Sequence, residues 1–332
     1  MNGRKAVMSS ENPVTIALDT MSNTDGSERA VRAAASLSLR PDAPEIFLLG
    51  NEKNISTLLD NIRHDAENLA LLHTGSGEAL EKGCELLKEG RADALVSAAT
   101  LSDLRTTCTK HFTSLPKINK HALGAVFPTE ERRGAKEDPF SLILDIGFES
   151  SAQTQDLINY ALMGAAYARV ISQNNQPRVA LLANNPDIAQ APEHLQEAFS
   201  ALEQNPLFKF IGVIEPVDIP LGKADVIVND GFVGNMALKL LENSGSILKQ
   251  LVTYAHRQKV LAQIGLMMLK PALRNLKTYV DWQEYGGAPL LGYEELCIKL
   301  AFNAPEQAYL NALRVAQKAA KNRFIDACKE AL

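Results

Sequence analysis

The chain has 332 residues, of which 46% are hydrophobic and 22% charged, and its formal net charge is −5. These are ordinary values for a folded globular protein, which excludes disorder for the bulk of the chain. No cluster of Lys and Arg forms a basic footprint and no run approaches 18 apolar residues, so we expect neither a nucleic-acid partner nor a membrane span.

The cysteines are scattered without the spacing of zinc ligands or of a disulfide framework. The first residues contain no apolar run long enough for a signal peptide. We therefore expect reduced thiols in the core of a cytoplasmic protein that holds no metal and no cofactor. The residues concerned are Cys84, Cys108, Cys297 and Cys328.

In the first third of the chain, strand patterns alternate with helical patterns. Residues 1–13 are expected to be a loose leader, followed by a single α/β domain over 14–332. The spacing is typical of βαβ units and predicts a doubly wound, mostly parallel sheet. The strands are expected at 14–19, 45–50 and 92–99, and the helices at 28–39, 77–89 and 100–112.

The middle of the chain continues this alternation. Residues 123–129 and 140–147 are expected to be strands joined by an exposed, charged hairpin turn. A helix of small residues follows at 154–170. Two further strands, at 178–184 and 210–216, flank a helix near 192–204.

The segment 222–242, "GKADVIVNDGFVGNMALKLLE", predicts a buried strand, a tight turn and a helix. Val226 to Val228 are β-branched and suit a strand that is buried on both faces. Gly231 and Gly234 allow a close backbone approach, and the free N–H groups of the helix favour an anion, so the turn 229–235 is a candidate phosphate site. The alternative is a plain Asp230-Gly231 turn with Asn235 as the helix N-cap.

Residues 236–280 carry no strand signal and predict a long helical hairpin inserted in the domain. Its apolar face either packs on the core of the chain or forms a dimer bundle. Alternatively, the apolar tip at 260–273 contacts an acyl chain or the inner face of the membrane as a peripheral site.

A second unusual string, "DWQEYGGAPLLG", covers 281–292. Gly286 and Gly287, followed by Pro289, predict a special turn rather than a regular helix or a central strand. The two glycines either line the path of a ligand or let two strands pass each other.

Standard catalytic motifs do not occur in this sequence. The chain lacks G-x-S-x-G, H-E-x-x-H, the P-loop and G-x-G-x-x-G, so a dehydrogenase is a weak hypothesis. The six histidines stand apart from one another, and a surface position is expected for each. A catalytic Cys–His pair stays open, but no pair is selected.

With these strings in view, the chain resembles the PlsX-type phosphate acyltransferases of bacterial phospholipid synthesis. The strings "GKADVIVNDGFVGNMALK" and "EYGGAPLLG" are similar to the most specific motifs of that family. "IALDTM", "DALVSAAT", "LILDIG", "YALMGAAYA" and "PRVALL" support the same register. The resemblance implies an isocitrate/isopropylmalate-dehydrogenase-like α/β fold related to phosphotransacetylases, a homodimer and a protruding helical hairpin.

The resemblance also implies a reaction and a set of site residues. The family converts acyl carrier protein (ACP) thioesters and inorganic phosphate into acyl phosphate and free ACP. Asn235 and Asp230 are the implied catalytic residues, because phosphate must be placed against a carbonyl and the oxyanion stabilised. The implied substrate-binding residues are Gly231, Phe232, Gly234, Lys223, Lys239, Asp19, Ser97, Asp145, Gly147, Tyr285, Gly286 and Gly287.

Four motifs depart from the family pattern. The family's "DAMGGD" corresponds to "DTMSNT" from Asp19, and its "SAGNTGA" to "SAATLS" from Ser97. Gln190 stands where the family has a lysine, and "IKLAFN" from Ile298 replaces "ISHGSS". Each lost charge-assisted hydrogen bond weakens phosphate binding by about 1.5–3 kcal/mol. Two hypotheses follow: a divergent acyltransferase, or a non-catalytic paralogue that binds ACP, acyl chains or a partner enzyme.

Overall fold

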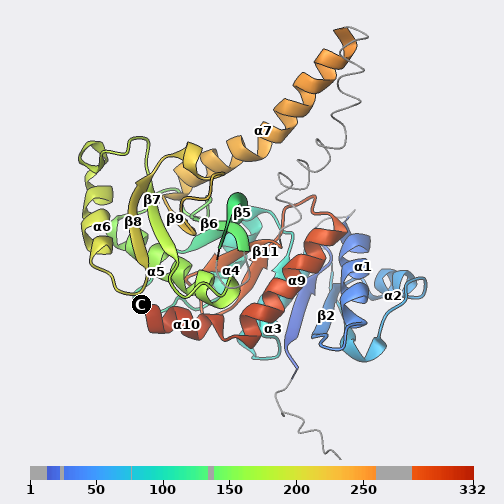
Figure 1. Ribbon diagram of the computed structural model, residues 1–332. Helices are drawn as coiled ribbons and strands as arrows, with labels where there is room; N and C mark the ends of the chain where they lie inside the picture. Colours follow the sequence, from blue (N-terminus) through green and yellow to red (C-terminus); the bar gives the residue numbers. More distant parts are fainter. Residues whose placement is uncertain (1–12, 23–25, 76, 134–137, 259–285) are drawn as a thin grey trace, which may run out of the picture.

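In the computed structural model, the described residues are 13–22, 26–75, 77–133, 138–258 and 286–332. They form a three-layer α/β structure around one 11-stranded sheet (Figure 1). The strand order is β3-β2-β1-β4-β11-β10-β5-β6-β9-β7-β8. The expected α/β class is therefore confirmed, while the single-domain boundary at 14–332 stays a prediction.

The N-terminal half of the sheet is parallel from β3 to β11. These strands are short and apolar, as expected for strands that helices cover on both faces. Strand β3 was not predicted, because its four apolar residues follow a polar stretch without alternation. The bounds are β1 (Thr15–Asp19), β2 (Glu45–Gly50), β3 (Leu69–His73), β4 (Ala94–Ser97) and β11 (Cys297–Lys299).

The second half of the sheet is parallel from β6 to β8, and an antiparallel centre joins the halves. Because the centre contains three antiparallel pairs, the two parallel halves run in opposite directions. The predicted hairpin of β5 and β6 is confirmed. The bounds are β5 (Ala122–Arg133), β6 (Asp138–Leu144), β7 (Arg178–Leu182), β8 (Lys209–Ile214), β9 (Val226–Val228) and β10 (Ala288–Leu291).

Helices cover both faces of the sheet. On one face the core is formed with α1 (Gly26–Ser38), α2 (Glu52–Leu59), α5 (Thr154–Ile171), α6 (Glu193–Glu203), α9 (Glu306–Lys321) and α10 (Phe324–Ala331). On the other face it is formed with α3 (Ala79–Lys88), α4 (Leu101–His111) and α7 (Gly231–Gln258). The short 3-10 helices are η1 (Ala66–Asn68), η2 (Ile188–Gln190) and η3 (Pro216–Asp218).

Helix α7 begins earlier than predicted. The expected turn over 229–235 is limited to Asn229 and Asp230, since residues from Gly231 onward are already helical. The helix continues to Gln258 and points away from the sheet in Figure 1. The leader up to residue 12, the rest of the predicted hairpin and its apolar tip at 260–273 lie outside the described residues. Among the described helices, none has the length and apolar character needed to cross a membrane.

The expectation for Pro289 was wrong. Pro289 lies in β10, between β11 and β5, and pairs with Ile298. The ladder to β5 is formed only from Leu290 onward, so the missing backbone N–H of Pro289 does not interrupt that ladder. The special turn is real but precedes the strand, because Gly286 and Gly287 have φ of 88° and 83°.

The expectation of a surface position was also wrong for His121. The ring is buried and stacks on Tyr293, with centroids 3.6 Å apart and planes inclined by 5°. Its Nε2 lies 3.0 Å from Ser114 Oγ. Sequence neighbours do not reveal this contact, because Tyr293 is far along the chain. The expected buried, unpaired state of the cysteines is confirmed for all four.

Burial makes His121 a source of acid sensitivity. Desolvation lowers the pKa of His121 to about 4, from an ordinary value near 6.5. As the pH falls, the unfolded chain therefore takes up the proton before the folded chain does. The stabilisation is fully present above the unfolded pKa and is lost as the pH falls toward the folded pKa. We expect His121 to contribute a loss of about 2 kcal/mol between about pH 7.5 and about pH 5.

Urea unfolding of the wild type and of His121→Phe at both pH values checks this expectation. Phenylalanine keeps the stacked ring but cannot take up a proton. The variant should lose less stability on acidification than the wild type. Equal losses in the two proteins would show that His121 is not held neutral.

Candidate functional site

Two of the expected substrate-binding residues meet at the carboxyl edge of the N-terminal half-sheet. Asp19 ends β1 and Ser97 ends the neighbouring strand β4, and Ser97 Oγ donates to Asp19 Oδ2 at 2.7 Å. Asp19 Oδ1 accepts the N–H groups of Met21 at 2.9 Å and Ser22 at 3.1 Å. Ser22 Oγ also bonds to the carboxylate. Asp19 therefore holds its own loop together at the strand end.

Lys299 is the next residue along this edge. It lies directly beside Ser97 in the parallel pairing of β11 with β4. Its side chain is partly buried, and Nζ donates to the carbonyl oxygen of Leu300 at 2.9 Å. Desolvation lowers the pKa of Lys299. Sequence reasoning did not select this residue, although a lysine that directly follows the buried pair Cys297-Ile298 is an unusual strand end.

A cavity of about 120 Å³ opens between the antiparallel centre of the sheet, α7 and the segment after β11. We call it the α7 cavity. Its lining is mostly apolar, and its charged members are Lys299 and Glu242. Desolvation raises the pKa of Glu242 to about 7. Other lining residues include Leu123, Ile146, Leu238 and Gly287.

The start of α7 is fixed by hydrogen bonds within the chain. Asp230 Oδ1 accepts the N–H of Val233 at 2.9 Å, so Asp230 rather than Asn235 caps the helix. Asn229 Nδ2 donates to the carbonyl oxygens of Asp145 at 2.6 Å and Asp230 at 2.9 Å. The turn therefore anchors α7 to the end of β6.

The glycines of this turn bring α7 against the protein's own backbone. A Cβ at Gly231 would lie 1.9 Å from the carbonyl oxygen of Glu149, and one at Gly234 would lie 1.9 Å from that of Asp145. We expected these glycines to allow a ligand to approach closely. In the structure, the group that approaches is the loop that follows β6.

Asp145 also lies against the start of α7, with its carboxylate beside Gly231. It is fully buried, and its carboxylate accepts the N–H groups of Leu123 (2.8 Å), Gly147 (3.2 Å), Phe148 (3.1 Å) and Glu149 (2.7 Å). Desolvation raises the pKa of Asp145 to about 6, although the four hydrogen bonds oppose the shift. The position next to Gly231 is therefore filled by a carboxylate of the protein itself.

Asn235 lies on the cavity side of α7. It precedes Leu238 and Glu242 by three and seven residues, which places the three side chains on one helical face. Its half-buried amide contacts Gly147, where a Cβ would lie 2.5 Å from Nδ2. Within the described part of the chain, the amide makes no hydrogen bond. Asn235 therefore offers a donor and an acceptor next to the α7 cavity.

Other expected residues lie apart from this cavity. Phe232 is 65% exposed at the start of α7, and Lys239 is exposed one turn after Asn235. Lys223 pairs with Asp218 at 2.7 Å in front of β9. Gly287 lines the cavity with Gly286 beside it, and Tyr285 lies outside the described residues.

The altered position Gln190 is exposed in η2. Its Nε2 donates to Asp187 Oδ2 at 3.1 Å, and its Oε1 accepts from Asn185 Nδ2 at 2.9 Å. The amide is thus used within its own loop. In the described residues, no group of three or more His, Cys, Asp or Glu could hold a metal ion.

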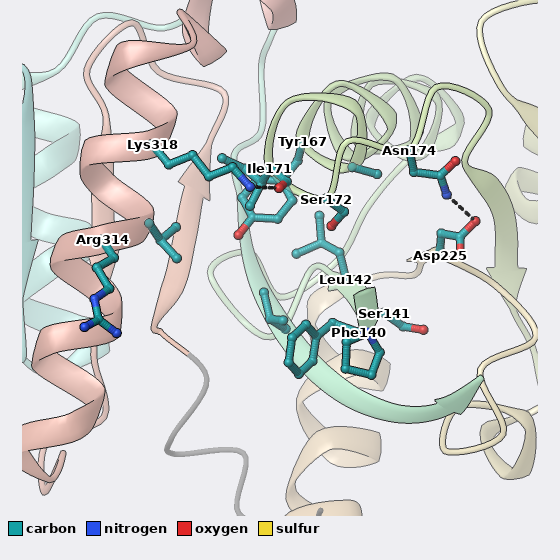
Figure 2. A pocket seen from close by; sticks show the side chains of 14 residues that line it. Phe140, Ser141, Leu142, Tyr167, Ile171, Ser172, Asn174, Asp225, Arg314 and Lys318 are labelled. Carbon is teal, nitrogen blue, oxygen red and sulfur yellow. Dashed lines mark hydrogen bonds between the residues drawn. The ribbon is translucent and has the colours of Figure 1, made fainter. Parts of the chain in front are cut away.

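A larger cavity of about 360 Å³ lies between α5, α9 and the start of β6 (Figure 2). Two pairs of its lining residues are hydrogen-bonded to each other. Lys318 donates to the carbonyl oxygen of Ile171, and Asn174 Nδ2 donates to Asp225 Oδ2 at 3.1 Å. We favour the α7 cavity as the functional site, because it adjoins the strand ends and the amide of Asn235.

Comparisons with known proteins find one family and many relatives that match most of the chain. Residues 14–327 match the family described as "Fatty acid synthesis protein". The phosphate acyltransferase of Heliobacterium modesticaldum is 35% identical over 333 residues, covering 95% of this chain and 96% of that protein. The phosphate acyltransferase of Dictyoglomus turgidum is 30% identical over 322 residues, covering 92% and 94%.

Solved structures show the same fold at much lower identity. The EutD phosphotransacetylase from Staphylococcus aureus superposes with a TM-score of 0.61 and 17% identity, covering 93% of this chain and 94% of that one. A branched-chain phosphotransacylase from Enterococcus faecalis has a TM-score of 0.57 and 14% identity, covering 92% and 99%. The relation to phosphotransacetylases that the sequence implied is therefore confirmed at the level of the fold.

The packing of Gly231 yields a stability test. We expect Gly231→Ala to lower the free energy of unfolding by at least about 2 kcal/mol, because the new methyl group would meet a backbone carbonyl that cannot move away. Gly83→Ala is the matched control. Its methyl group would meet the flexible end of Leu95, and alanine favours the helix by about 1 kcal/mol. Urea unfolding that gives equal values for both variants would contradict the proposed backbone contact.

Proposed function

The chain belongs to the phosphate acyltransferase family of fatty acid and phospholipid synthesis, and we propose that it transfers an acyl group from acyl-ACP to inorganic phosphate. The observation that carries the proposal is the family match over nearly the whole chain. We propose the α7 cavity, with the amide of Asn235 beside it, as the location of this reaction.

The proposed reaction needs few groups from the protein. An oxygen of hydrogen phosphate attacks the thioester carbonyl, the carbon–sulfur bond breaks, and the departing sulfur of ACP takes up the proton that the phosphate gives up, becoming a thiol. The products are acyl phosphate and free ACP. The enzyme must hold phosphate against the carbonyl and stabilise the negative charge that develops on the carbonyl oxygen.

Asn235 is proposed as the donor to this oxyanion. Its amide has no other hydrogen bond in the described structure and lies on the same helical face as the cavity-lining Leu238. Asp230 is proposed to act by holding the first turn of α7, through its bond to Val233. Asp145 and Gly147 are proposed to position the facing loop rather than to bind substrate through the buried carboxylate.

The partners follow from the same proposal. ACP delivers the acyl group, and the protein acts in the cytoplasm as a homodimer with a peripheral membrane contact through residues 260–273. The start of α7 supports a role in such contacts, because Phe232, Met236 and Leu240 recur at four-residue spacing and are 65%, 52% and 68% exposed.

A second candidate function is a non-catalytic paralogue that binds ACP, an acyl chain or a partner enzyme. The observation that favours it is Gln190, which stands at the position of a family lysine and uses its amide within its own loop. Catalysis and this alternative differ in one measurable quantity, the release of acyl phosphate.

We expect the purified protein to form acyl phosphate from a long-chain acyl-ACP and phosphate, detected by trapping with hydroxylamine. Asn235→Ala should lower kcat by about 10²–10³, because removal of one oxyanion donor has an effect of this size. Asn243→Ala is the control, since Asn243 is exposed on the same helix and donates to the carbonyl oxygen of Lys239.

Absence of product at saturating phosphate with any acyl-ACP would refute catalysis and favour the paralogue. Full activity in Asn235→Ala would be consistent with the proposed reaction but would show that Asn235 is not its oxyanion donor.

A further inference from the structure

We propose that the α7 cavity is an oxyanion-binding site in which Lys299 supplies the positive charge, and that its ligand in the reaction is inorganic phosphate. The identity of the ligand rests on the proposed function. The existence of the anion site rests on the cavity and on the lysine, which are independent of any assay of turnover.

The first argument is the hydrogen-bonding state of Lys299. A lysine ammonium group has three donors, and the described contacts use one of them, in the bond to the carbonyl oxygen of Leu300. Within the described residues, no carboxylate forms an ion pair with it. The cost of desolvating a partly buried ammonium group is poorly compensated when only one of its donors is used. An anion in the cavity would accept hydrogen bonds from the remaining donors.

The second argument is the charge balance of the cavity walls. Glu242 is the acidic lining residue, and its raised pKa of about 7 means that a large fraction is neutral near neutral pH. The remaining lining is apolar or backbone. A cation would find a single carboxylate there, whereas an anion finds an ammonium group without an ion pair in the described structure.

The third argument is size and position. A cavity of about 120 Å³ suits a small oxyanion with a few water molecules and is too small for a long acyl chain. Lys299 ends β11 directly beside Ser97, which places the site at the carboxyl edge of the parallel half-sheet. Ligands in open α/β sheets bind at this edge. The same cavity is lined by Leu238, one turn after Asn235 on α7.

The experiment is isothermal titration of the full chain with inorganic phosphate, comparing the wild type with Lys299→Gln and Lys299→Arg. We expect Lys299→Gln to weaken phosphate binding by about tenfold to a hundredfold, because one charge-assisted hydrogen bond is lost. Lys299→Arg, which keeps the charge, should retain most of the affinity. Lys53→Gln is the control for a general loss of charge, since Lys53 is exposed on α2.

Kinetics separate a binding role from a structural one. Lys299→Gln should raise the KM for phosphate far more than the KM for acyl-ACP, whereas a loosened fold would affect both. If Lys299→Gln does not fold, reductive ¹³C-methylation of the wild type provides a second readout. The signal of dimethylated Lys299 is the one that is missing from the spectrum of Lys299→Arg. Addition of phosphate to the wild type should shift this signal.

The outcomes also distinguish this proposal from the proposed function. Equal phosphate affinity in the wild type and Lys299→Gln would overturn the site and leave the acyltransferase activity untouched. A wild type that binds neither phosphate nor sulfate, and whose methyl-lysine signals do not respond, would overturn it as well. Lys299-dependent phosphate binding without turnover would support the site and refute catalysis.

Discussion

The buried carboxylate of Asp145 is the interaction on which the centre of the molecule depends. Its four backbone hydrogen bonds join the start of β5, at Leu123, to the loop after β6, at Gly147 to Glu149. The carbonyl of the same residue accepts from Asn229 at the end of β9. A buried charge with this many donors is costly to disturb, because each lost bond would leave part of it unsolvated. Strand, loop and helix are therefore held in one relative position.

The direction of the strands explains why the α7 cavity is lined by residues from both halves of the sheet. The two parallel halves of the sheet run in opposite directions, so their carboxyl ends lie at opposite edges. Helix α7 starts at one edge and reaches the antiparallel centre, where Leu238 and Glu242 line the α7 cavity. Lys299 enters the same cavity from the other half. Residues from both halves thus meet beside a single helix, which suits a reaction between two separate substrates.

The sequence departures become interpretable in this geometry. Ser22 stands where the family pattern has a glycine, and both its hydroxyl and its backbone N–H bond to the carboxylate of Asp19. Gln190 is held within its own loop. Lys299 introduces a charge within the altered motif after β11 and lines the cavity. Only contacts in space reveal these positions.

The sequence by itself determined the α/β class, the β5–β6 hairpin, the strand at Val226 to Val228 and the family, because these depend on local periodicity and on long strings of residues. Only the tertiary structure decided the role of residues whose partners are distant in the chain. It placed Pro289 in a central strand, buried His121 against Tyr293, and packed Gly231 against the backbone of the loop after β6. It also brought Lys299 and Glu242 to one cavity. The burial of a residue and the charges that it pairs with depend on its neighbours in space. The order of residues along the chain does not specify those neighbours.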